Sequence, residues 1–474
     1  MNLLLFLPET WVLITVVFLL GVILFTKENL SSILYPSVFL SAIILVLLSS
    51  YALFSSGELF YSTYRIDLLS QGFKWILSLC FLFTILFSRR LVSIHPEREA
   101  EYFFFLCTAT LGMMMLTSAM DVLTLYISLE LSSYSLYLLA SLRESKINAE
   151  SSVKYLVFGA AASGLLLWGL SLITGLSGST FFSVISKDVP LLMEQPAFAL
   201  GMVLASLAFF FKLSSFPMHF WAPDVYECAA TPVTSFVATA SKAAAVAVLI
   251  RFFILLGISQ SFVVILGVIA FVSMTLGNAI ALLQQDVKRL LAYSSIAQAG
   301  YILVGLLAGS FEGYSSSFFY AFSYVLMNAG AFLVTVLIAQ SERHDNPGLV
   351  HFDGLAERSP FLALILLLSL LSLAGIPPLI GFTGKWILFA AAMDKGHWFL
   401  VLWGVLNSVV SLFYYLTLVK HAYLEKPRTS APIPLPLPIK ILGLALFCGI
   451  VFLGIYPKWV ISFAQTAISK AMLL

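Results

Sequence analysis

The chain has 474 residues, of which 61% are hydrophobic and only 10% are charged. Soluble domains carry about 25% charged residues, so this composition excludes a soluble globular protein and indicates an all-α polytopic protein of the lipid bilayer. The formal net charge is +2, and the absence of basic runs excludes a nucleic-acid partner.

The chain begins MNLLLFLPETWVLITVVFLLGVILF, which has neither a basic start nor a small-residue cleavage site. We therefore expect a retained first helix rather than a signal peptide. A span needs about 20 mostly apolar residues, and on this measure the chain divides into about fourteen transmembrane helices. The expected ranges are 7–25, 33–54, 71–88, 101–119, 121–140, 150–175, 196–226, 232–256, 260–284, 290–308, 314–340, 358–393, 397–423 and 438–459.

Two of these segments are too long for one straight helix and contain helix breakers. Segment 196–226 contains Pro217, and segment 358–393 contains Pro377 and Pro378. Proline lacks a backbone donor and clashes with the preceding turn, so each helix should be broken within the membrane. Broken backbone is tolerated there only where it is buried in protein or lines a wet cavity. The breaks lie five segments apart, which predicts two inverted five-helix repeats, each with a broken helix.

These repeats divide the chain into four predicted parts. They are an N-terminal three-helix segment (1–100), a first repeat (101–256), a second repeat (257–424), and a proline-rich linker with the last helix (425–474).

The loop charges predict the orientation of the chain in the membrane. Alternating the loops between the two sides gives one side, which includes Arg89 and Arg90, about twice as many Lys and Arg residues as the other. The charges counted for the other side include Lys74 and Arg251. The richer side is expected to be cytoplasmic, which leaves both termini outside.

Four ionisable side chains lie deep inside apolar segments, namely Glu130, Lys212, Lys242 and Lys385. A charge at the bilayer centre costs about 2.5–3.5 kcal/mol on the insertion scale, so each should pair or face water. Glu130 lies about 13 Å along its helix from the preceding loop, and it is the natural partner of a lysine. A Glu130–Lys212 couple can hold and release a proton, although a purely structural ion pair is the alternative. The three lysines with intervening water predict a polar row across the middle of the membrane.

Two further residues are candidates for proton transfer. His219 falls in the first break, where its imidazole can relay protons or serve as a structural hydrogen-bonding group. Lys154 lies near the start of segment 150–175 and is either an inner member of the row or a residue that reaches the interface. No metal site is expected, since the remaining histidines lack ligand spacing. No redox centre is expected either, because the cysteines are single and widely spaced: Cys80, Cys107, Cys228 and Cys448.

Two stretches carry a resemblance to a known family. These stretches are FKLSSFPMHFWAPDVYECAATPVTSFVATASKAA and the later NAIALLQQDVKRLLAYSSIAQAGYILVGL. They are similar to the antiporter-like (Mrp-type) membrane subunits of respiratory complex I, and the resemblance covers residues 101–424. Within that family the chain resembles the N type, called subunit 2 in organelles. Three features carry this likeness. The chain opens with LLLFLPETWVL, it has Lys385 where the M-type subunit has a glutamate, and it lacks the long lateral helix of the L type.

The family's motif places its functional residues on this chain. Glu130 matches the fifth-helix glutamate, Lys212 the seventh-helix lysine paired with it, Lys242 the central eighth-helix lysine and Lys385 the twelfth-helix exit lysine. Lys154 and His219 fall at positions of the family's hydrophilic axis.

The resemblance implies a proton-translocating membrane subunit of an NADH:quinone oxidoreductase in a bacterial cytoplasmic (inner) membrane. Its partners would be a neighbouring antiporter-like subunit and the small-helix membrane subunits. NADH, FMN, iron–sulfur clusters and quinone would bind to partner subunits, with no cofactor on this chain. Two alternatives remain: a subunit of a multi-subunit cation/proton antiporter, and a purely structural membrane subunit that tolerates neutral replacements at all four buried charges.

Overall fold

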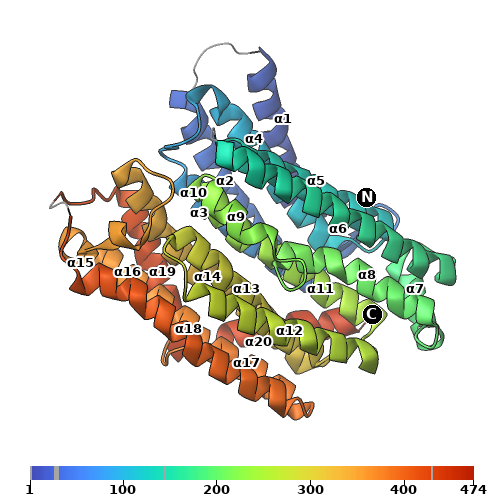
Figure 1. Cartoon of the computed structure of the whole chain (residues 1–474). Coiled ribbons are helices and arrows are strands. Elements are labelled where there is room, and N and C mark those ends of the chain that lie inside the picture. The colour runs from blue at the N-terminus through green and yellow to red at the C-terminus, as the bar shows by residue number, and fades with distance from the viewer. Residues whose placement is uncertain (1–2, 26–30, 144–145, 429–430, 474) are drawn as a thin grey trace.

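The computed structural model describes residues 3–25, 31–143, 146–428 and 431–473. In these residues the protein is a bundle of α-helices, as predicted, with one short hairpin of β1 (Gly57–Leu59) and β2 (Tyr64–Ile66) (Figure 1). The helices, in chain order, are α1 (Leu7–Phe25), α2 (Ser31–Ala52), α3 (Leu68–Phe87), α4 (Glu99–Ser118), α5 (Val122–Ser141), α6 (Lys146–Ser177), α7 (Phe182–Leu192), α8 (Pro196–Leu213), α9 (Trp221–Cys228), α10 (Thr231–Phe236), α11 (Lys242–Leu256), α12 (Gln260–Ala281), α13 (Val287–Leu307), α14 (Phe311–Glu342), α15 (Leu355–Arg358), α16 (Pro360–Ala374), α17 (Ile380–Asp394), α18 (Trp398–Leu424), α19 (Leu437–Ile455) and α20 (Lys458–Met472).

Thirteen helices of the described residues are long and apolar enough to cross a membrane. The expected segment 358–393 is divided into α16 and α17, each of 15 residues, so it does not add a further full-length span. The count of fourteen and the inverted repeats stay predictions.

Both predicted helix breaks are present. In the first, α8 ends at Leu213, Ser214 adopts a left-handed conformation (φ 60°), and α9 begins at Trp221. In the second, α16 ends at Ala374, and Gly375 (φ 91°) takes the left-handed position that commonly terminates helices.

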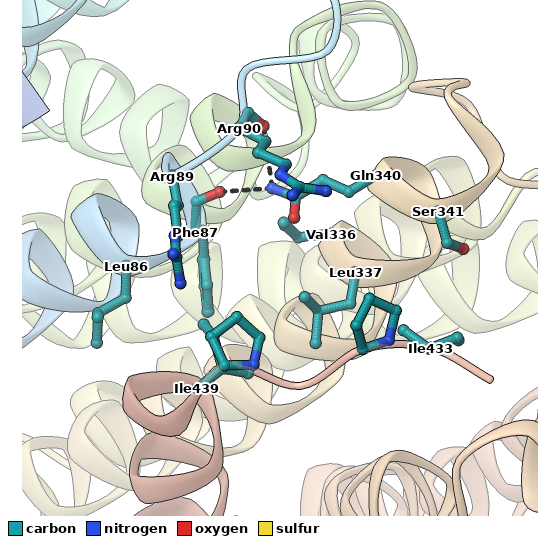
Figure 2. Close-up of a pocket in the computed structure, with 12 residues that line it drawn as sticks. Leu86, Phe87, Arg89, Arg90, Val336, Leu337, Gln340, Ser341, Ile433 and Ile439 are labelled. Atoms are coloured by element: carbon teal, nitrogen blue, oxygen red, sulfur yellow. Dashed lines mark hydrogen bonds between the residues drawn. The ribbon is translucent and has the colours of Figure 1, made fainter. Parts of the chain in front are cut away.

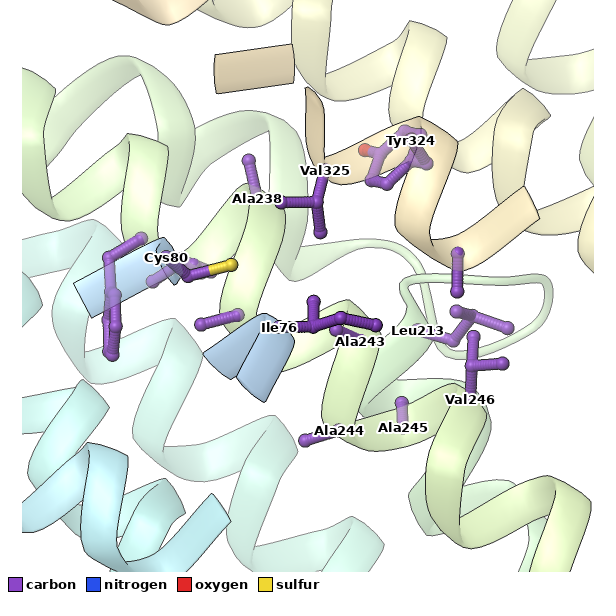
Figure 3. Packing of buried hydrophobic residues seen from close by; sticks show 14 of the residues in the cluster. Ile76, Cys80, Leu213, Ala238, Ala243, Ala244, Ala245, Val246, Tyr324 and Val325 are labelled. Carbon is purple, nitrogen blue, oxygen red and sulfur yellow. The ribbon is translucent and has the colours of Figure 1, made fainter. Parts of the chain in front are cut away.

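Helix α14 forms the centre of the bundle. The apolar stretch of α14 that is long enough to cross a membrane is entirely buried. The helix contacts α3, α11, α13, α16, α17, α19 and α20. Figure 1 shows α5 and α6 on one side of this centre and α16 and α18 on the opposite side. Small side chains on α11 (Ala243, Ala244 and Ala245) allow it to contact both α3 and α14 closely, and Figure 3 shows Ala243 beside Ile76 of α3.

Helices α5 and α13 begin in the same way. Asp121 caps the N-terminus of α5, and its backbone forms a β-bridge with Phe181. Asp286 caps the N-terminus of α13, and its backbone forms a β-bridge with Gly348. An aspartate at this position accepts hydrogen bonds from the free first amides of the helix.

The C-terminal part differs from the expectation in one respect. The proline-rich stretch before Leu437 contains no regular helix in its described residues, and its residues 429–430 lie outside them. After the last expected span, however, the chain forms the additional helix α20, which packs on α3 and α14.

Candidate functional site

The four predicted buried charges all lie inside the protein. Glu130 on α5 is 8% exposed, Lys212 at the end of α8 is 3% exposed, Lys242 at the start of α11 is 1% exposed, and Lys385 on α17 is 4% exposed. None of these side chains therefore turns outward to lipid.

Lys212 contacts the helix that carries Glu130. Its Nζ donates a hydrogen bond of 2.5 Å to Ser132 Oγ, two residues beyond Glu130 on α5. The Glu130 carboxylate is close enough to act on Lys212 electrostatically, yet no ion pair within 4 Å joins the two in the described structure. Glu130 Oε1 is buried without a hydrogen-bond partner. Lys212 therefore binds a serine on the glutamate's helix rather than the glutamate itself, and one carboxylate oxygen remains free to accept a proton or a hydrogen bond.

Lys242 lies beside an irregular stretch of its helix. A π-helical turn, Val237–Ser241, immediately precedes it, and such turns are frequent at functional sites. Lys242 Nζ donates to Ser295 O at 3.0 Å and to Ser295 Oγ at 2.8 Å, on α13, and lies 5.9 Å from the centre of the Tyr324 ring. All these partners are neutral.

Lys385 uses the second helix break directly. Its Nζ donates to the carbonyls of Leu373 (2.9 Å) and Ala374 (3.1 Å) and to Ser408 Oγ (3.1 Å). The last carbonyls of a helix have no partner within the helix, so the early end of α16 supplies acceptors inside the bundle. The broken helix therefore creates the binding position of the lysine head group.

A chain of polar side chains leads from the neighbourhood of Lys242 to Lys385. Ser294, next to the Ser295 partner of Lys242, makes a short hydrogen bond with the Tyr415 hydroxyl. Gln298 Nε2 donates to Tyr415 at 3.4 Å and to Leu373 O, the acceptor of Lys385, at 3.0 Å. The sequence interpretation did not identify these residues. Their signal was the spacing of Ser294 and Gln298, four residues apart and thus on one face of α13.

His219 and Lys154 occupy different environments. His219 lies in the first break, is 4% exposed, packs 4.3 Å from the Phe220 ring centre, and has a buried Nδ1 without a hydrogen-bond partner. The Lys154 side chain is 43% exposed and forms ion pairs with Glu150 (2.9 Å) and Asp224 (3.1 Å). His219 is therefore buried, as the four charged residues are. Lys154 instead lies in a charged cluster at the end of the bundle.

A second buried cluster lies at the other end and contains Lys74, whose charge was counted with one side of the membrane. Lys74 lies within α3, and its Nζ is 2.6 Å from Glu9 Oε1, with both side chains fully buried. Tyr64 donates to the same oxygen at 2.6 Å. This pair could not be predicted from the sequence, because Glu9 and Lys74 lie far apart along the chain and meet only in the fold.

Arg251 is also buried, within helix α11, although its charge was counted with one side of the membrane. Its guanidinium binds Asp67 through two hydrogen bonds of 2.8 and 2.9 Å. Burial favours the neutral carboxyl of Asp67, but the Arg251 charge and hydrogen bonds outweigh this effect and hold the pKa of Asp67 below its ordinary value.

Metal and redox sites are not indicated in the described residues. No group of three His, Cys, Asp or Glu side chains there could hold a metal ion. The fold and the buried polar groups together define a polytopic helical membrane protein of the antiporter-like class.

Comparison with known proteins agrees with this class. The family model for NADH:quinone oxidoreductase/Mrp antiporter membrane proteins matches residues 119–411. NADH-quinone oxidoreductase subunit N 2 of Syntrophobacter fumaroxidans is 43% identical over 422 residues, 88% of this chain and 89% of that protein. The protein of the same name from Solidesulfovibrio magneticus is 40% identical over 455 residues, 95% of each chain. The chain therefore belongs to the NADH:quinone oxidoreductase/Mrp antiporter family, and its curated relatives include subunit N proteins.

Solved structures share the fold. A chain of respiratory complex I from Thermus thermophilus matches with a TM-score of 0.84 and 30% identity, covering 97% of this chain and 99% of that one. A chain of the Mrp complex from Dietzia sp. DQ12-45-1b matches with a TM-score of 0.85 and 20% identity, covering 100% and 98%. At that lower identity the likeness concerns the fold alone.

Proposed function

We propose that the chain is a proton-translocating membrane subunit of an NADH:quinone oxidoreductase in a bacterial cytoplasmic membrane. Glu130, Lys212, Lys242 and Lys385 are its proton-transfer groups, with His219 as an accessory group at the first break. Quinone reduction and the NADH, FMN, iron–sulfur and quinone sites belong to partner subunits. The neighbouring antiporter-like and small-helix membrane subunits would be its direct partners.

One observation carries this proposal. The ammonium groups of Lys242 and Lys385 are buried among neutral acceptors and have no carboxylate within 4 Å in the described structure. A buried charge without a counter-ion costs several kcal/mol, so a structural role alone gives no reason to keep it. A group whose charged and neutral forms are both accessible is suited to taking up and releasing a proton.

A change in the distance between Glu130 and Lys212 supplies the switch in this proposal. A charge pair at 4 Å interacts by about 4 kcal/mol at an effective dielectric constant of about 20. Approach of Glu130 to Lys212 therefore favours a protonated lysine, and its withdrawal favours release of the proton. A change of charge in a neighbouring subunit would set the position of Glu130.

The polar chain on α13 and α18 supports transfer between the halves. The hydroxyls of Ser294 and Tyr415 can pass a proton, and Gln298 holds Tyr415 and the Leu373 carbonyl in fixed relation to Lys385. Lys154 would act at the entrance, because its ion pair with Asp224 places it at the exposed end of the bundle.

The test is the Lys212→Ala substitution in the assembled complex reconstituted in vesicles. We expect NADH-driven proton pumping to fall by about tenfold or more, whereas Lys395→Ala, which removes an exposed lysine between α17 and α18, leaves it unchanged. Intact pumping and coupled turnover in Lys212→Ala would contradict the assignment.

A cation/proton antiporter subunit is the second candidate, favoured by the shared fold with the Mrp complex. Measured Na⁺ or K⁺ exchange by the isolated chain in vesicles would support this alternative. A structural subunit would instead retain all pumping when the four buried charges are neutralised.

A further inference from the structure

A cavity of about 140 Å³ lies at one end of the bundle, away from the buried lysines (Figure 2). Three parts of the chain form its walls. They are the end of α3 with the following turn, the last turns of α14, and the stretch that leads into α19.

The position of this cavity corresponds to a membrane–water boundary. The spanning helix α3 ends at Phe87, α14 ends at Glu342, and α19 begins at Leu437. Since these are membrane-spanning helices that end or begin beside the cavity, it lies at the depth of the lipid head groups. The loop charges assign this end to the cytoplasmic side, where anionic lipids attract basic residues.

Two arginines line the cavity. Arg89 and Arg90 are both exposed, and neither has a carboxylate within 4 Å in the described part of the chain. Gln340 of α14 fixes the turn that carries them, because its Nε2 donates to Phe87 O at 2.9 Å and to Arg90 O at 3.0 Å. Figure 2 shows these two hydrogen bonds beside both arginines. The site thus holds two unpaired positive charges on an anchored turn.

The other walls are apolar. Leu86, Leu337, Ile433 and Ile439 line the cavity. Directly beyond it, α19 presents exposed apolar side chains at a helical spacing that places them on one face: Leu437, Ile441 and Leu444. A small water-soluble anion would gain nothing from these surfaces, but the acyl chains of a lipid would cover them.

We propose that this cavity binds the head group of an anionic phospholipid, with its phosphate on Arg89 and Arg90 and its acyl chains along α19. Guanidinium groups bind phosphate through paired hydrogen bonds. The cavity volume suits a head group, and the chains lie outside it. The bound lipid joins α3, from the N-terminal segment, to α14 and α19, and so holds the N-terminal and C-terminal parts of the bundle together at this end. This inference does not depend on proton transfer.

The test uses the protein purified from membranes with its partner subunits and exchanged into nanodiscs. Native mass spectrometry would count retained lipids in phosphatidylglycerol and in phosphatidylcholine. We expect preferential retention of phosphatidylglycerol by the unmodified protein, and at least about fivefold weaker retention in Arg89→Gln/Arg90→Gln.

Two control variants keep the result interpretable. Arg89→Lys/Arg90→Lys preserves the charges and should retain most of the lipid, which excludes misfolding of the turn as the cause. Lys420→Gln/Arg428→Gln removes two exposed charges of the same predicted face and should retain lipid as the unmodified protein does. Equal phosphatidylglycerol retention in the Gln variant would overturn the proposal. So would equally effective displacement of the lipid by inorganic phosphate, or a cross-link showing a partner subunit seated in the cavity.

Discussion

Lys74 Nζ lies 2.6 Å from Glu9 Oε1, and neither side chain is exposed. The contact joins the first turn of α1 to the interior of α3. Tyr64 of the β-hairpin donates to the same carboxylate and covers the pair from the outer end. The N-terminal helices are therefore tied to each other by charge as well as by apolar packing.

This pair predicts a strongly non-additive effect on stability. Lys74→Met alone leaves the Glu9 carboxylate buried without its counter-ion and should lower the free energy of unfolding by about 3–5 kcal/mol. The double variant Glu9→Gln/Lys74→Met removes both charges and should recover most of this loss. Thermal unfolding of the purified chain in detergent measures both values. Equal losses in the single and double variants would show that the pairing does not matter.

The polar chain beside Lys385 predicts a defect in transport without a defect in folding of comparable size. Gln298→Leu removes the amide that links Tyr415 to the Leu373 carbonyl, and should slow proton pumping by about tenfold. The matched control is Thr335→Val, since the Thr335 hydroxyl is also buried but, among the described residues, bonds only to Ala331 O within α14. Pumping measured in vesicles with both variants should separate a specific link from the general loss of a buried polar group.

The second helix break predicts a position where glycine is required. A Cβ on Gly381 would overlap the Ser372 carbonyl, whose helix end supports Lys385. Gly381→Ala should therefore destabilise the protein by about 1–3 kcal/mol through overpacking. A Cβ on Gly267, in α12, would meet nothing within 4 Å, so Gly267→Ala should be neutral or slightly stabilising. Similar unfolding temperatures for the two variants would contradict this account of the break.

The sequence allowed the membrane fold, both helix breaks and the four buried charges to be predicted, because each depends on local composition. Pro217 and the Pro377–Pro378 pair lie in the middle of segments too long for one helix, and a lysine flanked by apolar residues is visible in the chain itself. The partners were not predictable in the same way. Ser132 for Lys212 and the Ser294–Tyr415 contact depend on how distant helices pack. Lys74 was counted as a charge at the membrane surface, because its counter-ion Glu9 lies far away along the chain and the buried pair is visible only in the fold.

The central claim is that buried lysines carry protons, and the most direct test concerns Lys242, which lies between the two breaks and has only neutral partners among the described residues. The measurement is the number of protons pumped per NADH oxidised by the reconstituted complex with Lys242→Ala, with Lys395→Ala as the control. We predict that the ratio falls by about half or more with Lys242→Ala and stays unchanged in the control. An unchanged ratio at normal turnover in Lys242→Ala would contradict the account.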